Sequence, residues 1–206
     1  MTDDPRLFAP ATARNRDPIW NVLGPELPTR GLVLEIAAGS GEHSVHFARL
    51  AVPTLHFQPT DPDVSARASI DAWATRSGLP NVKPALALDA ASGTWPVTQA
   101  DVVVCINMIH ISPWAATAGL VRGSARVLPP GGLLFLYGPY RRNGQHTAPS
   151  NAAFDADLRR RNPAWGVRDM EAIAALAAEA RFAAPVVVPM PANNFSLLFR
   201  RATAAG

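Results

Sequence analysis

The sequence has a single cysteine, Cys105, so the chain offers no pair for an internal disulfide, and we expect a cytoplasmic location. Cys105 stands in the apolar run 102–106, which predicts a small buried side chain rather than a catalytic thiol. No apolar run is long enough to span a bilayer. The polar start at residues 1–6 predicts no secretory signal. We therefore expect no membrane partner.

Basic charge is also sparse, with a formal net charge of +3 over 206 residues. Almost all of the positive charge is arginine, and its one dense cluster covers residues 159–161, near Arg141 and Arg142. A nucleic-acid-binding protein usually shows a broader basic stripe with interleaved aromatic residues. The charge pattern therefore argues against nucleic acid as a partner. It favours either a solvated helix face or an anchor for an acidic group of a substrate.

Internal repeats and low-complexity segments are absent from the sequence too. The length suits one domain over residues 1–206. We expect the protein to be a monomer or a homodimer. Strand-like and helix-like patterns alternate along the chain. Strands are predicted at residues 31–36, 54–58, 82–88, 101–107 and 132–137, and helices at residues 14–23, 42–50, 64–76 and 113–127. Such alternation is typical of a parallel sheet with helices on both faces.

The C-terminal part breaks this alternation. A helix at residues 169–180 is followed by strands at residues 184–189 and 195–201. The link between these two strands is too short for a crossover helix, so they are expected to pair antiparallel. The chain is therefore predicted to have an α/β, Rossmann-like fold, with a mostly parallel seven-stranded sheet that ends in an antiparallel hairpin.

The turn after the first predicted strand carries a glycine-rich motif, Val-Leu-Glu-Ile-Ala-Ala-Gly-Ser-Gly-Glu-His at residues 33–43. Glycines suit a tight turn that a ligand approaches closely. Glu35, Ala37, Gly39 and Gly41 resemble the acidic-x-Gly-x-Gly-x-Gly pattern of class I methyltransferases, with Ala37 in place of the first glycine. Together with the terminal hairpin, the resemblance implies the class I methyltransferase fold and binding of S-adenosylmethionine (SAM).

Further candidate cofactor residues follow the next three predicted strands. Asp61 is expected to bind the ribose hydroxyls, because a carboxylate accepts hydrogen bonds at both oxygens. The resemblance implies that Asp89 and Ala90 contact the adenine, and that Asn107 and Met108 lie under the methionine part of SAM. Asp61 and Asp89 are alternatively helix or turn caps. On the first helix, Asn15 and its neighbour Arg14 are candidates for the SAM carboxylate.

Two alternatives to a SAM-dependent enzyme remain open. An NAD-binding fingerprint needs a glycine where Ser44 stands, so an NAD-linked oxidoreductase is the weaker reading. A SAM-binding sensor or partner subunit without catalysis would have the same cofactor motif. No metal site is predicted, because His43 and His46 have no nearby carboxylate or cysteine partner.

Residues 150–159 and 162–169 resemble the methyltransferase-like 26 family, as do residues 13–19 and 189–194. The resemblance extends over nearly the whole chain. It implies the fold and the cofactor but no particular substrate. We therefore predict methyl transfer from SAM to a small molecule, with S-adenosylhomocysteine (SAH) as the product.

The candidate chemistry lies after the fourth and fifth predicted strands. His110 is a candidate general base, since an unperturbed imidazole has a pKa of about 6.5, and alternatively a structural histidine. The polar segment 138–168 is predicted to be an inserted lid over the substrate. It supplies the candidate catalytic residues Tyr140 and His146.

Three further residues are candidates for substrate contact: Asn151, Asp155 and Asn193. Each has an alternative role that needs no substrate. Asn151 suits a helix N-cap, Asp155 suits an ion pair with Arg159 one turn later, and Asn193 suits the turn of the terminal hairpin.

Overall fold

The computed structural model describes residues 4–203, and a six-stranded sheet forms its centre. The strands follow the order β2, β1, β3, β4, β8, β7 across the sheet. Their bounds are β1 Gly31–Ile36, β2 Leu55–Thr60, β3 Val102–Ile106, β4 Leu133–Gly138, β7 Val186–Met190 and β8 Asn194–Arg200. The first four are parallel, whereas β8 is antiparallel to both of its neighbours. The predicted C-terminal hairpin on a mostly parallel sheet is confirmed.

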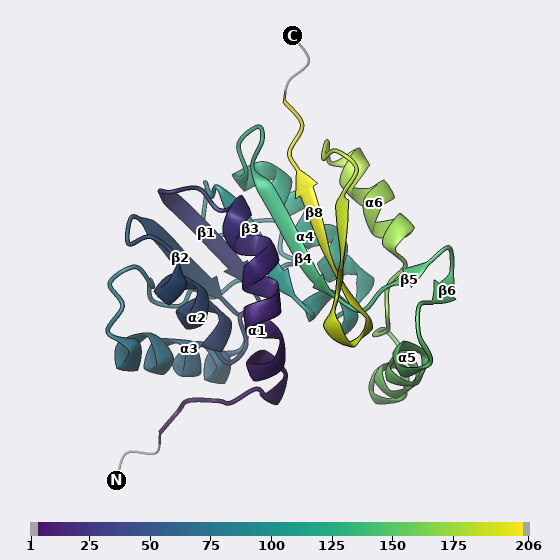
Figure 1. The fold of residues 1–206 in the computed structure, drawn as a ribbon, viewed down its shortest axis with the longest axis horizontal. Coiled ribbons are helices and arrows are strands. Elements are labelled where there is room, and N and C mark those ends of the chain that lie inside the picture. Colours follow the sequence, from purple (N-terminus) through teal and green to yellow (C-terminus); the bar gives the residue numbers. More distant parts are fainter. Residues whose placement is uncertain (1–3, 204–206) are drawn as a thin grey trace.

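Helices cover both faces of the sheet (Figure 1). One face carries α1 Pro10–Leu23 and α2 Glu42–Leu50, with α3 Val64–Ser77 beside α2, and the other carries α4 Trp114–Val127 and α6 Met170–Glu179. Beyond the carboxyl ends of the parallel strands lie α5 Pro149–Arg161 and the short hairpin of β5 Arg141–Arg142 and β6 Gln145–His146. Three 3-10 turns complete the elements: η1 Gly24–Glu26, η2 Met108–His110 and η3 Pro191–Asn193.

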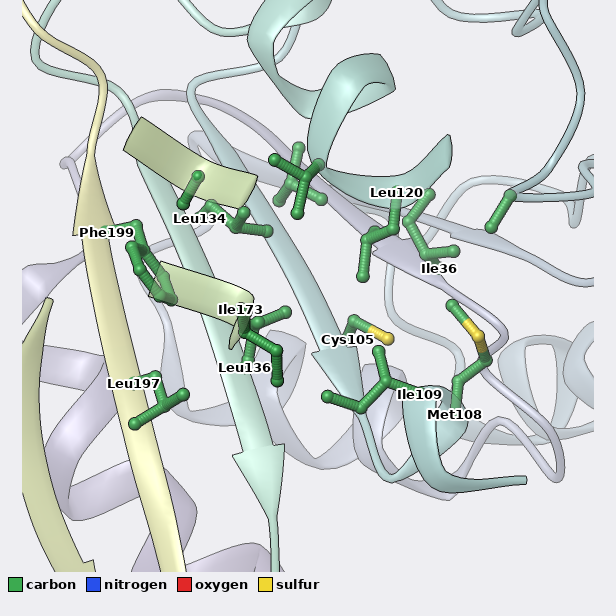
Figure 2. Close-up of a cluster of buried hydrophobic side chains, with 14 of the residues drawn as sticks. Ile36, Cys105, Met108, Ile109, Leu120, Leu134, Leu136, Ile173, Leu197 and Phe199 are labelled. Atoms are coloured by element: carbon green, nitrogen blue, oxygen red, sulfur yellow. The ribbon is translucent and has the colours of Figure 1, made fainter. Parts of the chain in front are cut away.

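Alternation along the central strands divides the core into two layers. In β3, Val102 and Val104 belong to the cluster under α1 and α2, while Val103 and Cys105 belong to the cluster under α4 and α6. Figure 2 shows the second cluster, in which Leu120 of α4 joins side chains of the sheet. Burial of such large apolar side chains stabilises the fold by roughly 1.5–3 kcal/mol each. A strand buried on both faces is therefore apolar throughout, as β3 is.

One predicted strand is wrong. Residues 82–88 form no strand, so the sheet has six strands rather than seven within residues 4–203. The segment runs beside β2 and makes isolated parallel bridges to it at Val82 and Leu86. β2 carries Pro59 and the segment carries Pro84, and neither nitrogen can donate to a ladder. Pairing resumes only where Leu86 donates its N–H to the Pro59 carbonyl at 3.2 Å.

No helix of the described chain has both the length and the apolar character that crossing a membrane requires.

Close packing of α4 shapes the sheet edge described below. A Cβ at Gly119 would lie 2.1 Å from the carbonyl oxygen of Ala90 and 2.7 Å from Cα of Ala91. Both contacts are with backbone, which cannot move aside as a side chain can. Glycine at position 119 therefore lets α4 approach the segment after residue 88.

We predict that Gly119→Ala destabilises the protein by roughly 1–3 kcal/mol, because overpacking outweighs the better helix propensity of alanine. Urea unfolding measures the change. Gly93→Ala is the matched control, since a Cβ there meets nothing within 4 Å. Equal stability of Gly119→Ala and the unmodified protein would contradict the packing argument.

Candidate functional site

The turn from β1 into α2 has left-handed backbone at three of the predicted motif positions. Ala37 has φ 55°, Gly39 φ 59° and Gly41 φ 88°. A Cβ at Gly41 would come within 2.7 Å of Cα of Ile70, so glycine lets α3 pack against the turn. A Cβ at Gly39 would meet nothing within 4 Å. The absence of a side chain at Gly39 therefore leaves space beside the turn.

That space is part of a cavity of about 460 Å³, which we name the glycine-loop cavity. Its lining includes six of the predicted cofactor residues: Ala37, Gly39, Asp61, Asp89, Ala90 and Met108. Apolar side chains of Leu88, Ile106 and Ala116 line it as well. The cavity thus combines two carboxylates with an apolar wall, and it lies at the carboxyl ends of β1, β2 and β3.

Asp61 is a buried carboxylate that organises the motif. One of its oxygens accepts the N–H of Gly39 at 3.0 Å and the other accepts the N–H of Asp63 at 2.9 Å. A carboxylate has about four acceptor positions, so each oxygen keeps capacity for a ligand hydroxyl. Asp89 is exposed and accepts the N–H of Ala91 at 2.9 Å. The alternative turn-capping role therefore exists at both positions, alongside their place in the cavity wall.

Glu35 lies behind the turn and not in the cavity lining. Its side chain is buried and accepts a hydrogen bond from the hydroxyl of Ser44 in α2. Burial raises the pKa of Glu35 from 4.5 to about 7, against the opposing effect of the Ser44 hydrogen bond. The glutamate therefore connects β1 to α2 beneath the glycines. Its role toward a ligand is indirect.

A second cavity of about 600 Å³ lies between α1, α5 and the tip of the β7–β8 hairpin; we name it the asparagine cavity. It is lined by the carboxamides Asn15, Asn107, Asn151, Asn193 and Asn194, together with Arg14, Ser150 and Tyr137. Pro18, Pro139, Pro191 and Phe154 supply apolar wall. Asn15, Asn107, Asn151 and Asn193, which the sequence predicted for cofactor or substrate, thus meet in one place.

The carboxamides of the asparagine cavity are held by specific partners. Nε2 of His43 lies 2.9 Å from Oδ1 of Asn15, and burial lowers the pKa of His43 to about 3, so the neutral ring donates this hydrogen bond. Asn151 donates to Oγ1 of Thr147 at 3.0 Å and to the carbonyl of Asn193 at 2.9 Å. The N-cap of α5 is Ala148, so Asn151 does not cap this helix.

At the end of β3 the two cavities border successive residues of the chain, a position that we call the junction. Ile106 lines the glycine-loop cavity, and the next residue, Asn107, lines the asparagine cavity. Asn107 has φ 63°, and Ala192 and Asn193 at the hairpin tip have φ 56° and 58°. Such left-handed conformations are costly for residues other than glycine and cluster at functional sites. Asn107 therefore combines a place at the junction with a backbone conformation that is typical of functional sites.

His110 lines neither of these two cavities. Its ring is fully buried, packs edge-on against Tyr140 at 5.1 Å, and its Nδ1 lies 3.4 Å from the backbone N–H of Arg168. Burial, assisted by the charge of Arg168, lowers the pKa of His110 to about 3. The carbonyl of His110 accepts the N–H of Gly166 at 2.9 Å. These contacts fit the alternative reading of a structural histidine.

The remaining candidates also lie apart from the cavity walls. Tyr140 is buried in the core, and burial raises the pKa of its hydroxyl. Nε2 of His146 lies 3.5 Å from Oδ2 of Asp155. Asp155 also accepts hydrogen bonds from the side chain of Arg159 at 3.1 Å and from the N–H of Val167 at 2.7 Å. The predicted ion pair of Asp155 with Arg159 is therefore present.

Several lining residues were missed by reading the sequence. Residues 111–113, which precede α4, and residues 115–116 in its first turn border the glycine-loop cavity, and Phe154 and Pro139 border the asparagine cavity. Pro113, directly before α4, was a usable signal, because a helix that begins just after a parallel strand begins at the ligand-binding edge. Phe154 carried no such signal, since its placement depends on how α5 packs.

A family model described as "Protein of unknown function (DUF938)" matches residues 6–201 of the chain. The fold is similar to an O-methyltransferase family protein from Burkholderia thailandensis, with a TM-score of 0.79 and 18% identity over 95% of this chain and 58% of that one. It is also similar to human N-acetylserotonin methyltransferase solved in complex with SAM, with a TM-score of 0.77 and 13% identity over 94% of this chain and 53% of that one.

A third similar structure is the methyltransferase CalO1 of calicheamicin biosynthesis in its SAH-bound form, with a TM-score of 0.74 and 18% identity over 93% of this chain and 54% of that one. This chain spans somewhat more than half the length of these three proteins. The likenesses confirm the predicted class I methyltransferase fold.

Glu35 generates a prediction on pH dependence. Above pH 4.5 the unfolded chain releases this proton, whereas the folded protein keeps it until about pH 7, so stability falls as pH rises through this interval. The loss that Glu35 causes amounts to about 3 kcal/mol. Glu35→Gln removes this loss, so the free energy of unfolding of the variant should rise relative to the unmodified protein between these pH values.

Urea unfolding at a series of pH values measures the difference between the two proteins. Comparison by difference cancels the other titrating groups, among them His43 and His110. Glu179→Gln, at an exposed position of α6, serves as the control and should show no such trend. A difference for Glu35→Gln that does not change with pH would refute the assignment.

Proposed function

This chain belongs to the DUF938 family, and from that premise we propose that it is a SAM-dependent methyltransferase that acts on a small molecule and releases SAH. The observation that carries the proposal is that two cavities border successive residues at the end of β3, Ile106 and Asn107. One cavity has the glycine turn and the carboxylates Asp61 and Asp89, and the other combines carboxamides with an apolar wall and has a size that suits a small ligand.

The described residues fit the cofactor in kind and in order. Asp61 is proposed to bind the ribose hydroxyls, Asp89 and Ala90 the adenine, and Leu88, Ile106 and Ala116 the faces of the base. Asn107 and Met108 are proposed to lie against the methionine part, with Asn15 of α1 at its carboxylate. Arg14, which is exposed at the edge of the asparagine cavity, is assigned to the acceptor instead. SAM supplies a methyl group on a positively charged sulfur that a nucleophile can attack.

Other side chains of the protein hold the proposed cofactor-binding residues in position. Asp61 holds the turn by accepting the N–H of Gly39, and Ser44 with Glu35 fixes the start of α2 against β1. His43 orients the carboxamide of Asn15 toward the asparagine cavity by occupying its oxygen. Alignment of two bound reactants at one junction contributes to catalysis by itself, without covalent chemistry from the protein.

Segment 138–168 is proposed to cover the acceptor. Ser150, Asn151 and Phe154 of α5 supply one wall of the asparagine cavity. The segment is anchored at its far end, where Arg168 donates to the carbonyls of Ile109 at 3.0 Å and Ser112 at 2.6 Å. The resemblance of this segment to the methyltransferase-like 26 family stays a prediction. Two of the similar structures support a small-molecule acceptor. One is named for N-acetylserotonin, and the other belongs to the biosynthesis of calicheamicin.

A SAM-binding protein without catalysis is the second candidate. It is favoured by the absence of the predicted catalytic residues His110, Tyr140 and His146 from the walls of the two described cavities. Asn151, in contrast, lines the asparagine cavity, where an enzyme would use its carboxamide to position an acceptor. An NAD-linked oxidoreductase has no observation in its favour beyond Asp61, which would suit either ribose.

We predict that SAM and SAH both bind the purified protein in isothermal calorimetry and that NAD does not. Asp61→Ala should weaken SAM binding at least about tenfold, because the ribose loses its acceptor and the glycine turn loses its anchor. Circular dichroism should show the fold of this variant unchanged.

The matched control is Asp157→Ala, which removes an exposed carboxylate from α5 outside both cavities. Its SAM affinity should equal that of the unmodified protein. Unchanged SAM affinity of Asp61→Ala would remove the ribose assignment. Binding of NAD in place of SAM would remove the proposed function.

A further inference from the structure

The walls of the asparagine cavity have a chemical composition that restricts the acceptor. Its titratable lining side chains, within the described chain, are Arg14 and Tyr137. Its other polar side chains are carboxamides and the hydroxyl of Ser150, none of which changes charge near neutral pH. No aspartate, glutamate, histidine or lysine of residues 4–203 lines it.

Resting on the proposed function, we propose that the methyl acceptor is an organic acid, bound in the asparagine cavity as its carboxylate and methylated without proton removal by a side chain. The two titratable groups in the wall explain why. Arg14 is permanently charged and has no proton-accepting capacity. Burial raises the pKa of Tyr137, so its phenol stays protonated at neutral pH.

Groups behind the walls do not supply the missing base. His43 contacts the cavity only through Asn15, and burial lowers its pKa to about 3. His110 lies against Gly138, where a Cβ would come within 2.4 Å of its Nε2, and its pKa is also about 3. Asp155 is engaged with Arg159, which holds the pKa of that carboxyl below its usual range despite partial burial. A base of such low pKa takes few protons from an alcohol or an ammonium group.

Charge selects between the acceptors that need no base. A protonated amine would meet Arg14 and the cationic sulfur without any wall carboxylate to stabilise it. An anionic acceptor would instead be attracted by Arg14 and by the cationic sulfur. Arg14 and Asn193 are exposed residues of the cavity wall, and the side-chain nitrogen of Asn193 donates a 3.2 Å hydrogen bond to Ser150. Charge-assisted hydrogen bonds of this kind are stronger than those to neutral acceptors.

The reaction balances without a proton. A carboxylate oxygen forms a bond to the methyl carbon as the carbon–sulfur bond breaks, and the electron pair of that bond goes to sulfur. An anion and a cation thus become a neutral methyl ester and a neutral thioether. The task of the cavity is to hold the carboxylate at the junction, beside Asn107.

The apolar part of the wall describes the rest of the acceptor. Pro18, Pro139 and Pro191 present rigid apolar surface, and Phe154 adds an aromatic ring that is 40% exposed. A flat apolar body, such as an aromatic ring, suits such a surface. Aryl and arylacetic acids are therefore appropriate probes of this site.

Nuclear magnetic resonance titration of the full chain tests the proposal with four named probes. Benzoate and phenylacetate are compared with their neutral isosteres benzamide and phenylacetamide, with SAH bound to the protein. The acids should bind at least about tenfold more tightly than the amides, and they should shift the side-chain resonances of the cavity asparagines.

Variants test whether residues of the asparagine cavity cause the difference in affinity between the acids and the amides. Arg14→Gln should weaken acid binding severalfold and leave amide binding unchanged, whereas Arg122→Gln, at an exposed position of α4 outside both cavities, should change neither. Asn193→Asp, a nearly isosteric change that adds a negative charge, should also weaken the acids. Binding of the amides as tightly as the acids, shifts outside the cavity, or no binding of the acids while SAH binds would overturn the proposal. Failure of SAH itself to bind would instead contradict the proposed function.

Discussion

The hydrogen bond from the Gly39 N–H to the Asp61 carboxylate joins the turn after β1 to the end of β2, and the organisation of the site depends on it. The two residues come from neighbouring parallel strands, whose carboxyl ends must meet at one edge of the sheet. Packing of apolar side chains on both faces fixes that edge, with α1 and α2 on one side and α4 and α6 on the other. The glycine-loop cavity follows from this arrangement, because its wall consists of the segments that leave the strands.

At that edge of the sheet the two cavities differ in the chemistry of their walls. Carboxylates and apolar groups surround the glycine-loop cavity, whereas carboxamides and one guanidinium group surround the asparagine cavity. Left-handed backbone at Ala37, Asn107 and Asn193 occurs in both walls. The structure therefore maintains costly conformations at the places where ligands would bind, which is expected of a preorganised site.

Much of the fold and of the glycine-loop cavity could be predicted from the sequence, because the residues that determine them are close together in the chain. The glycine turn, the acidic residue after β2 and the terminal hairpin all depend on neighbouring residues. The strand expected at residues 82–88 does not form, because Pro84 of this segment and Pro59 of the partner strand cannot donate to a ladder. Pro84 was a readable local signal, whereas the pairing with Pro59 depends on the fold. The burial of His110 was equally hidden, because it results from residues 166–168, far along the chain, which pack over it. Its reactivity could not be read from its position after a strand.

The central claim is that one bound molecule of cofactor extends from the glycine turn to the junction at Asn107. A crystal structure of the protein with SAH tests it most directly. The account predicts the adenosine part in the glycine-loop cavity, with a ribose oxygen on Asp61 and the sulfur beside Asn107, facing the asparagine cavity. SAH bound elsewhere, or bound with its sulfur directed away from the asparagine cavity, would contradict the account.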